Sequence, residues 1–596
     1  MNVSLTVRIS ALALLAACPL SAGQINFVYP PEGSSLPQVA KTFVFGNVSP
    51  ATAPFTINGE KISVYKNGGF IAYLPVSGGD FAFKGALSDG TTAQRGLKVR
   101  QAEAPAPVST GTLRLEFTSN ASDSELLAGD YIRITAAGTP GRQAVASLEG
   151  VFSDLAMIET PPGSGRYSAY YRVKDSDSCQ GAQLSARFKA GLFGHGASAR
   201  SKGKVRIAQQ LSLVETYTDT VILRNAPEGG YMLFLGKGVK LLAAGRNNGM
   251  RRVLLSPTET GWVEDSKVQY SGPAVPSYNG TETGAIKLRR TDTGSSAAVT
   301  MYERVPYKAE VLENGLRVTL YYANLHTNWV VYDSSDTLVK NVSFRQTGSN
   351  TVEIDFETAP GALWGYNIGY ANGSKSLVVD LRARPKASLS WPRPLAGVSV
   401  VLDPGHSPKT TPPYDGAIGP MASFEYQVNL AIAKKAQEKL LALGATVQMT
   451  RNGDENVPLA DRPKIAQALG GDIFISIHNN AIGDGEDPFA QPRGFSVYHY
   501  QRHSRALAAA LHRAYLKDIA LPDEGLRYGD YLVARMTWMP AALIENAYMI
   551  LPEQEAMLNS PEFQDKLGAA IAEGVLNFFG APERPAPPAP RKKGKK

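Results

Sequence analysis

The chain has 596 residues, which at roughly 150 residues per domain predicts about four domains rather than one core. A hydrophobic fraction of 43% against 19% charged residues excludes a largely disordered protein. The net charge is +8, but from Gly580 onward six basic side chains face Glu583 alone, which is +5 of the +8. The rest of the chain is close to neutral and has no basic stripe, so we expect no nucleic-acid partner.

The first 23 residues are typical of an export signal. Arg8 precedes an apolar run at 9–17, which is too short to span a bilayer but fits a signal-peptide core. Two ways of processing stay open. Leu15-Ala16-Ala17-Cys18 resembles a bacterial lipobox, with Cys18 as a lipidated first residue and Pro19 as a departure, whereas cleavage near residue 22 would release a free protein. Both predict an exported protein of the periplasm or cell envelope without a transmembrane helix.

Short strands with Gly, Asn and Pro at the turns then predict several β domains. The expected ranges are two sandwiches at 24–101 and 112–208, a barrel at 215–270 and a further β domain at 284–384, with linkers at 102–111 and 385–395. The sandwiches resemble bacterial immunoglobulin-like (Ig-like) modules, and the barrel, ending in Gly261-Trp262-Val263, resembles SH3-like wall-binding domains. The fourth region resembles the AMIN-type targeting domain. We expect Trp262 in the core rather than stacking on a ligand.

From 396 to 580, strands alternate with helices of ten or more residues, which is the pattern of an open α/β sheet. Apolar strands predicted at 398–402, 473–477 and 541–544 lead to three polar side chains, which are His406, His478 and Glu545. A helix that opens at Phe424, with Ser423 as its expected N-cap, places Glu425 in its first turn.

These four side chains predict one site, because the carboxyl ends of the strands in an open α/β sheet line a common crevice. Two histidines and one carboxylate are the ligand set of a catalytic zinc ion with an open position for water. His406, His478 and Glu425 supply that set, which leaves Glu545 as the general base. Singly, each has an ordinary structural explanation, and their joint placement favours the site.

At these residues the chain resembles a known family, the zinc-dependent N-acetylmuramoyl-L-alanine amidases that cleave bacterial peptidoglycan. Matching stretches include Val401-Leu402-Asp403-Pro404-Gly405-His406, Asp415-Gly416-Ala417-Ile418-Gly419, Ile475-Ser476-Ile477-His478-Asn479-Asn480-Ala481 and Pro540-Ala541-Ala542-Leu543-Ile544-Glu545. The resemblance implies His406, Glu425 and His478 as Zn²⁺ ligands and Glu545 as the catalytic carboxylate. It also implies the substrate bond, the amide between the lactyl group of muramic acid and L-alanine.

Two departures from the family pattern concern the rim of the site. The usual Gly-Gly after the first histidine is replaced by the longer stretch 407–414, and Asn546-Ala547-Tyr548 follows Glu545. Some relatives carry an inserted helix after the second histidine that blocks the zinc. The segment 482–493 is short and rich in Gly, Asp and Pro, so we expect no such helix here.

Two arginines near the site have alternative roles. Arg451 and Arg462 are candidates for binding the acidic stem peptide, and the alternative is ion pairing with Asp454 and Asp461.

Other functions remain open at this point. The same ligands suit a zinc peptidase or another amide hydrolase of the envelope, and an inactive wall-binding adaptor is a third reading, against which the intact residue set argues. The tail 581–596 is a Pro/Ala spacer with a basic end, either a solubilising arm or a contact to an anionic envelope polymer.

Overall fold

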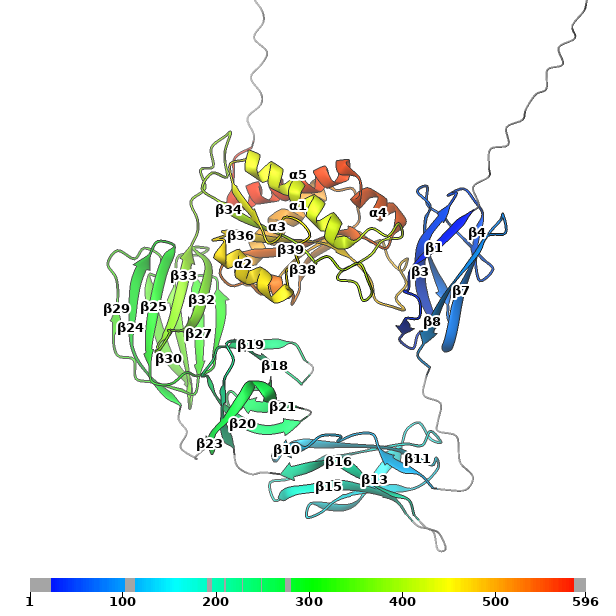
Figure 1. The fold of residues 1–596 in the computed structure, drawn as a ribbon. Helices are drawn as coiled ribbons and strands as arrows, with labels where there is room; N and C mark the ends of the chain where they lie inside the picture. The colour runs from blue at the N-terminus through cyan, green and yellow to red at the C-terminus, as the bar shows by residue number, and fades with distance from the viewer. Residues whose placement is uncertain are drawn as a thin grey trace, which may run out of the picture.

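The computed structural model of the chain describes residues 23–101, 113–189, 196–207, 211–227, 229–247, 249–273 and 280–583. The expected signal segment with Cys18, the linker 102–111 and the basic end of the tail lie outside these residues. Four β-rich regions form an arc, and the first and the fourth flank a C-terminal α/β region (Figure 1). No helix in the described residues is both long and apolar enough to cross a bilayer.

The first β region, residues 24–99, consists of two sheets around one core. The sheets have the orders β1 (Gln24–Tyr29), β3 (Lys41–Ser49), β6 (Gly69–Pro75) and β2 (Ser35–Leu36), β8 (Thr92–Val99), β7 (Gly79–Leu87), β4 (Phe55–Ile57), β5 (Glu60–Ile62). Phe27, Phe55 and Phe83 are buried between them. The alternation of apolar and polar residues along these strands places one face of each sheet in this core.

The second and third β regions are joined through main-chain pairing, because Glu125 of β10 pairs with Arg246 of β20. The second contains β9 (Leu115–Phe117), β10 (Ser124–Leu126), β11 (Tyr131–Gly138), β12 (Ala144–Leu148), β13 (Phe152–Glu159), β14 (Arg166–Arg172), β15 (Cys179–Phe188) and β16 (Ser198–Ile207). The third contains β17 (Ser212–Thr216), β18 (Val221–Arg224), β19 (Tyr231–Leu235), β20 (Lys240–Asn247), β21 (Met250–Leu254), β22 (Thr260–Glu264), η1 (Asp265–Lys267) and β23 (Val268–Pro273). Trp262 is only half-buried and lies outside the core, because Gly261 and Val263 take the inward positions of β22.

The fourth β region packs two sheets together and shares its core with the third. Tyr321 and Tyr370 of the fourth region pack into the core of the third, and Leu242 of the third region packs against the core of the fourth. Its sheets have the orders β28 (Ala323–Leu325), β24 (Thr281–Thr291), β25 (Gly294–Met301), β33 (Leu377–Ala383), β32 (Leu363–Tyr370), with β29 (Val330–Val331) beside β24, and β26 (Tyr307–Leu312), β27 (Gly315–Tyr321), β31 (Thr351–Glu357), β30 (Asn341–Gly348).

The C-terminal region is an open sheet of six strands with helices on both faces. The strand order is β35 (Thr446–Met449), β34 (Ser399–Pro404), β36 (Ile473–Asn480), β39 (Ala541–Tyr548), β37 (Phe495–His499), β38 (Asp523–Tyr528), and the first four are parallel. The helices are α1 (Glu425–Ala442), α2 (Arg462–Ala468), α3 (Arg505–Asp518), α4 (Pro552–Leu558) and α5 (Pro561–Phe579), with short turns η2 (Leu459–Asp461), η3 (Arg502–Ser504) and η4 (Leu532–Arg535). α1, α3 and α5 cover the larger core, and α2 and η4 cover the opposite face. The α/β architecture expected for this region is therefore confirmed.

The fourth β region is fixed to the amino end of this sheet by a buried ion pair. An Arg382 Nη2–H donates to Asp472 Oδ1 over 2.6 Å, and both side chains are about one-tenth exposed or less. The Trp364 indole N–H donates to the carbonyl of Asp472 over 2.7 Å, and Ser399 N–H donates to its other carboxylate oxygen. Asp472 immediately precedes β36, so this contact holds the sheet at the end away from the predicted site.

This contact predicts a large stability effect for Arg382→Met, which leaves the Asp472 carboxylate buried without its charged partner. We expect the free energy of unfolding to fall by about 3 kcal/mol, measured by urea denaturation. The same substitution at Arg206, whose side chain is 53% exposed in its pair with Glu125, should cost less than about 1 kcal/mol. Equal losses for the two variants would contradict the assigned role of Arg382.

Candidate active site

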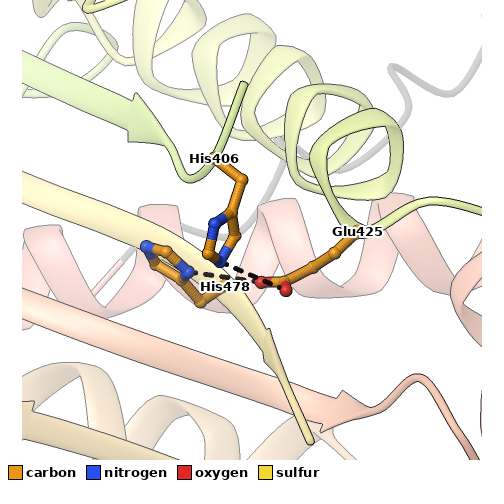
Figure 2. A group of neighbouring side chains, drawn as sticks. All are labelled: His406, Glu425 and His478. Carbon is orange, nitrogen blue, oxygen red and sulfur yellow. Dashed lines mark hydrogen bonds and ion pairs between the residues drawn. The ribbon is translucent and has the colours of Figure 1, made fainter. Parts of the chain in front are cut away.

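Three side chains from separate elements meet at the carboxyl ends of β34 and β36. His406, Glu425 and His478 each offer a ligand atom, and these atoms all lie within 4.8 Å of one another. Figure 2 shows the Glu425 carboxylate on one side of the two imidazoles, joined to each by a dashed line. His406 Nε2 is 3.2 Å from Glu425 Oε2, and His478 Nδ1 is 3.2 Å from Glu425 Oε1. The structure therefore brings together the three residues that the sequence predicted as a metal set.

His406 lies two residues beyond β34 in a strained backbone conformation. Its φ is +63°, in the left-handed region that residues with a Cβ seldom adopt, and such strain is held by surrounding contacts. Those contacts come from Asp415, which lies 2.8 Å from His406 Nδ1 and also accepts the Ser407 N–H. Because a carboxylate only accepts, it fixes the proton on Nδ1 and leaves Nε2 to face Glu425.

Glu425 is the first residue of α1 and is 3% exposed. Its Oε2 accepts the Ala417 N–H over 2.7 Å, and its Oε1 accepts the Asn479 N–H over 3.0 Å. The expected N-cap was wrong, because Phe424 occupies that position and the Ser423 hydroxyl instead donates to Glu555. Glu555, which lies on α4, also accepts the Met421 N–H. Its carboxylate therefore holds the segment that leads into α1.

Two glycines leave the space in which the three side chains converge. A Cβ on Gly405 would lie 2.2 to 2.6 Å from ring atoms of His478. A Cβ on Gly416 would lie 2.7 Å from His406 and 2.8 Å from the Glu425 carboxylate, and Gly416 also has a φ of +96°. Any larger side chain at either position would displace a member of the set.

Glu545 lies beside the set but outside it. It pairs in register with His478 between the parallel strands β39 and β36, so both side chains point from the same face of the sheet. Its Oε2 is buried and has no hydrogen-bond partner within the described part of the chain. Burial and the negative charge of Glu425 raise the pKa of Glu545 well above its usual value, against the attraction of His406. A buried carboxyl group with a raised pKa holds a proton more readily than an exposed one, which suits a group that transfers protons.

The electrostatics of the three converging groups are tightly linked. Burial opposes the charged form of His406, but the charge of Glu425 and hydrogen bonds to Glu425 and Asp415 raise the pKa of His406 to about 9. Burial likewise opposes ionisation of Glu425, and the charge and hydrogen bonds of the two histidines hold its pKa below the usual range. The site therefore stabilises the ionised form of Glu425 through positive charge next to it. A divalent cation bound by the three side chains would supply positive charge at the same place.

Arg451 and Arg462 do not fit the predicted contact with a stem peptide, because they are 2% and 3% exposed. Arg451 donates to the carbonyls of Pro404, Gly405 and Tyr426. Arg462 donates to the carbonyl of His406 over 2.8 Å and forms an ion pair with Asp403 over 2.7 Å. The alternative partner Asp461 was also wrong, since it pairs with Lys464. Both arginines instead hold the turn that carries His406.

The sequence predicted only some features of the loops around the site. The segment 482–493 is fully described and forms turns without a helix, as expected. Asp415 and Glu555 were missed as supports of the site. Asp415 offered a sequence signal, a carboxylate nine residues after the first histidine, whereas Glu555 offered none because it reaches Ser423 across 132 positions.

The C-terminal region is similar in sequence to known proteins. The family model described as N-acetylmuramoyl-L-alanine amidase matches residues 400–577. A protein of Staphylococcus epidermidis named "Probable cell wall amidase LytH" is 34% identical over 244 residues, covering 41% of this chain and 76% of the relative. A Staphylococcus aureus protein of the same name is 35% identical over 190 residues, covering 32% and 60%.

Solved structures with similar sequence were also found. The N-acetylmuramoyl-L-alanine amidase AmiC2 of Nostoc punctiforme is 32% identical, covers 30% of this chain and 97% of its own, and has a TM-score of 0.28. The catalytic domain of CwlV, an amidase from Bacillus (Paenibacillus) polymyxa var. colistinus, is 32% identical, covers 31% and 99%, and has a TM-score of 0.29.

The close approach at Gly405 predicts that Gly405→Ala weakens metal binding without unfolding the protein. Its methyl group would push the His478 ring out of position, so we expect zinc affinity to fall about 10- to 100-fold, measured by competition with a chromogenic chelator. Gly369→Ala is the control, because a Cβ there meets no atom within 4 Å. Unchanged affinity of the Gly405 variant would contradict the described packing.

Proposed function

Because the chain belongs to the N-acetylmuramoyl-L-alanine amidase family, it is a peptidoglycan amidase, and we propose that it works with a zinc ion held by His406, Glu425 and His478. The proposed bond is the amide between the lactyl group of muramic acid and L-alanine. The single observation that carries this proposal is the convergence of two imidazole nitrogens and one carboxylate within 4.8 Å. Beside them lies a buried carboxyl oxygen of Glu545 that has no hydrogen-bond partner among the described residues.

The residues present fit a zinc ion on the chemistry of their donors. Two histidine nitrogens and one carboxylate oxygen are the protein ligands of many catalytic zinc sites. Gly405 and Gly416 keep the space between them free of side chains, and Asp415 orients His406 from behind. When bound, zinc supplies Lewis acidity, which polarises a carbonyl and lowers the pKa of a water to about 7.

Glu545 is the proposed proton carrier. Its raised pKa, caused by burial and the nearby charge of Glu425, matches a group that takes a proton from the attacking water and returns it to the departing alanine nitrogen. Asp415, Arg451 and Arg462 hold the turn of His406 during these steps. Their proposed role is positioning, through backbone contacts rather than through the substrate.

The proposed role of Glu545 predicts that Glu545→Gln retains zinc and loses turnover. The amide keeps the shape of the side chain but cannot accept the proton, so the rate of wall hydrolysis should fall about 100- to 10,000-fold. Dye release from labelled peptidoglycan measures the rate, and atomic absorption measures the zinc content. A variant with the wild-type rate would show that another group transfers the proton.

The raised pKa of His406 predicts that zinc uptake releases a proton. At pH values below the His406 pKa of about 9, the ring carries a proton that competes with the metal. The apparent affinity for zinc should therefore rise with pH up to that value. Calorimetry in buffers of different ionisation enthalpy measures the release, expected to be about one proton at pH 7. His406→Ala should abolish it. Uptake without proton release would contradict the assignment of His406.

The experiment that tests the bond specificity is a digest of purified peptidoglycan with and without a chelator, followed by mass analysis of the products. Free amino groups of L-alanine on released stem peptides, lost with chelator, would support the proposal. Cleavage within the stem peptide would indicate a zinc peptidase, and an absence of any cleavage would indicate an adaptor. New sugar-reducing ends alone would overturn the amidase assignment.

We further propose that the β regions are wall-targeting modules, Ig-like at 24–101 and 112–208, SH3-like at 215–270 and AMIN-like at 284–384. Their sheets of mostly antiparallel strands around compact cores support this. An enzyme that acts on the cell wall has to reach the envelope, and we propose export through residues 1–23, with either Cys18 lipidation or cleavage near residue 22.

We propose that the basic tail binds an anionic envelope polymer. Wall binding should then be sensitive to salt and should be lost on removal of 582–596.

A further inference from the structure

The first β region contacts the catalytic region at the end of the sheet that carries the site. Strands β1 and β3 lie on the side of the first region that faces the catalytic region (Figure 1). They share a hydrophobic cluster with it, whose buried members are Val28, Phe43, Phe45, Ile418, Tyr548, Ile550 and Leu551. The rings of Tyr29, Phe43 and Phe45 stack along this face, with neighbouring centroids 5.2 to 5.3 Å from Tyr29. The contact is therefore an apolar, aromatic interface.

Three hydrogen bonds fix the register of this interface. The Tyr29 hydroxyl donates to Asp484 Oδ1 over 2.5 Å, and the Tyr73 hydroxyl donates to the carbonyl of Gly485 over 2.9 Å. The Asn47 amide donates to the carbonyl of Pro420 over 2.8 Å. A Cβ on Gly485 would lie 2.4 Å from the Val39 side chain, so the backbones approach closely here.

The contacted segments are the ones that adjoin the site residues. Pro420 lies in the loop between Asp415 and Glu425. Asp484 and Gly485 follow His478 by six and seven residues. The cluster residues Tyr548, Ile550 and Leu551 follow Glu545 by three, five and six residues. The first β region thus contacts the loop that precedes Glu425 and the segments that follow His478 and Glu545.

These loops have little structure of their own. Between β36 and β37 the chain forms only turns, and between Asp415 and α1 it contains a single bridge, Ile418 to Phe424. Ordering such segments has a conformational entropy cost that contacts from outside the loop must offset. The first β region supplies these contacts on one side, and Glu555 supplies them on the other through Met421 and Ser423.

We propose that the first β region is a positioning element of the active site, acting through Tyr29, Asn47 and Tyr73 on the loops that hold Glu425, His478 and Glu545. This inference rests on the amidase function proposed above. Displacement of a reacting group by about 1 Å can lower a rate 100-fold, so the docking of this region controls turnover rather than wall affinity alone. Tyr29, Asn47 and Tyr73 touch no reacting atom, and their role is positioning.

The test uses the full chain with Tyr29→Phe and Tyr73→Phe combined, which removes two hydroxyls and keeps both rings in the cluster. On a small soluble muropeptide we expect kcat to fall about 10-fold with KM within about 2-fold, and hydrogen exchange at 481–494 to rise. Tyr167→Phe is the matched control, because its hydroxyl donates to the Thr139 carbonyl inside the second β region. It should leave kcat and that exchange unchanged.

A second pair of variants tests the same contact from the catalytic side. Asp484→Asn keeps an acceptor for Tyr29 and should retain nearly the wild-type kcat, whereas Asp484→Ala should match the tyrosine variant. A wild-type kcat for both the tyrosine variant and Asp484→Ala would overturn the proposal. An effect confined to KM on polymeric wall would also overturn it, in favour of a substrate-binding interface. In either case wild-type release of L-alanine ends would leave the amidase function standing.

Discussion

The active site depends on one buried carboxylate that is shared by two histidines. Glu425 presents one oxygen to each imidazole, and the amide groups of Ala417 and Asn479 donate to the same two oxygens. A buried charge is stable only when it is paired and its lone pairs are satisfied. β34, β36 and the first turn of α1 must therefore keep their mutual positions, because the turn after β34 carries His406, β36 carries His478 and α1 carries Glu425 itself.

The sheet on which this site is built is held at both ends by β regions that are distant in sequence. At the amino end, Arg382 and Trp364 of the fourth region bind Asp472, the residue before β36. At the carboxyl end, the first region packs on the loops beside His478 and Glu545. In a chain whose β regions are proposed as targeting modules, this arrangement couples their docking to the geometry of the site.

The sequence predicted the site residues because their signals are local. An apolar strand that leads to a histidine or glutamate, or a helix that begins beside one, can be recognised from a few consecutive residues. Predictions failed where a partner lies far along the chain. Ser423 was expected to cap α1 but donates to Glu555. Arg462, for which a contact with the stem peptide and an ion pair with Asp461 were the alternatives, pairs with Asp403 on β34. Trp262 failed for a different reason, since a shift of one position along a strand exchanges the inward and outward faces.

The proposed chemistry requires that His406, Glu425 and His478 together bind one metal ion. X-ray absorption at the zinc edge of the zinc-loaded full chain measures this most directly. We expect two imidazole nitrogens and carboxylate oxygen at about 2.0 to 2.2 Å from the metal, with one imidazole lost in His406→Ala and in His478→Ala. A spectrum that is unchanged in both variants would place the metal elsewhere and contradict this requirement.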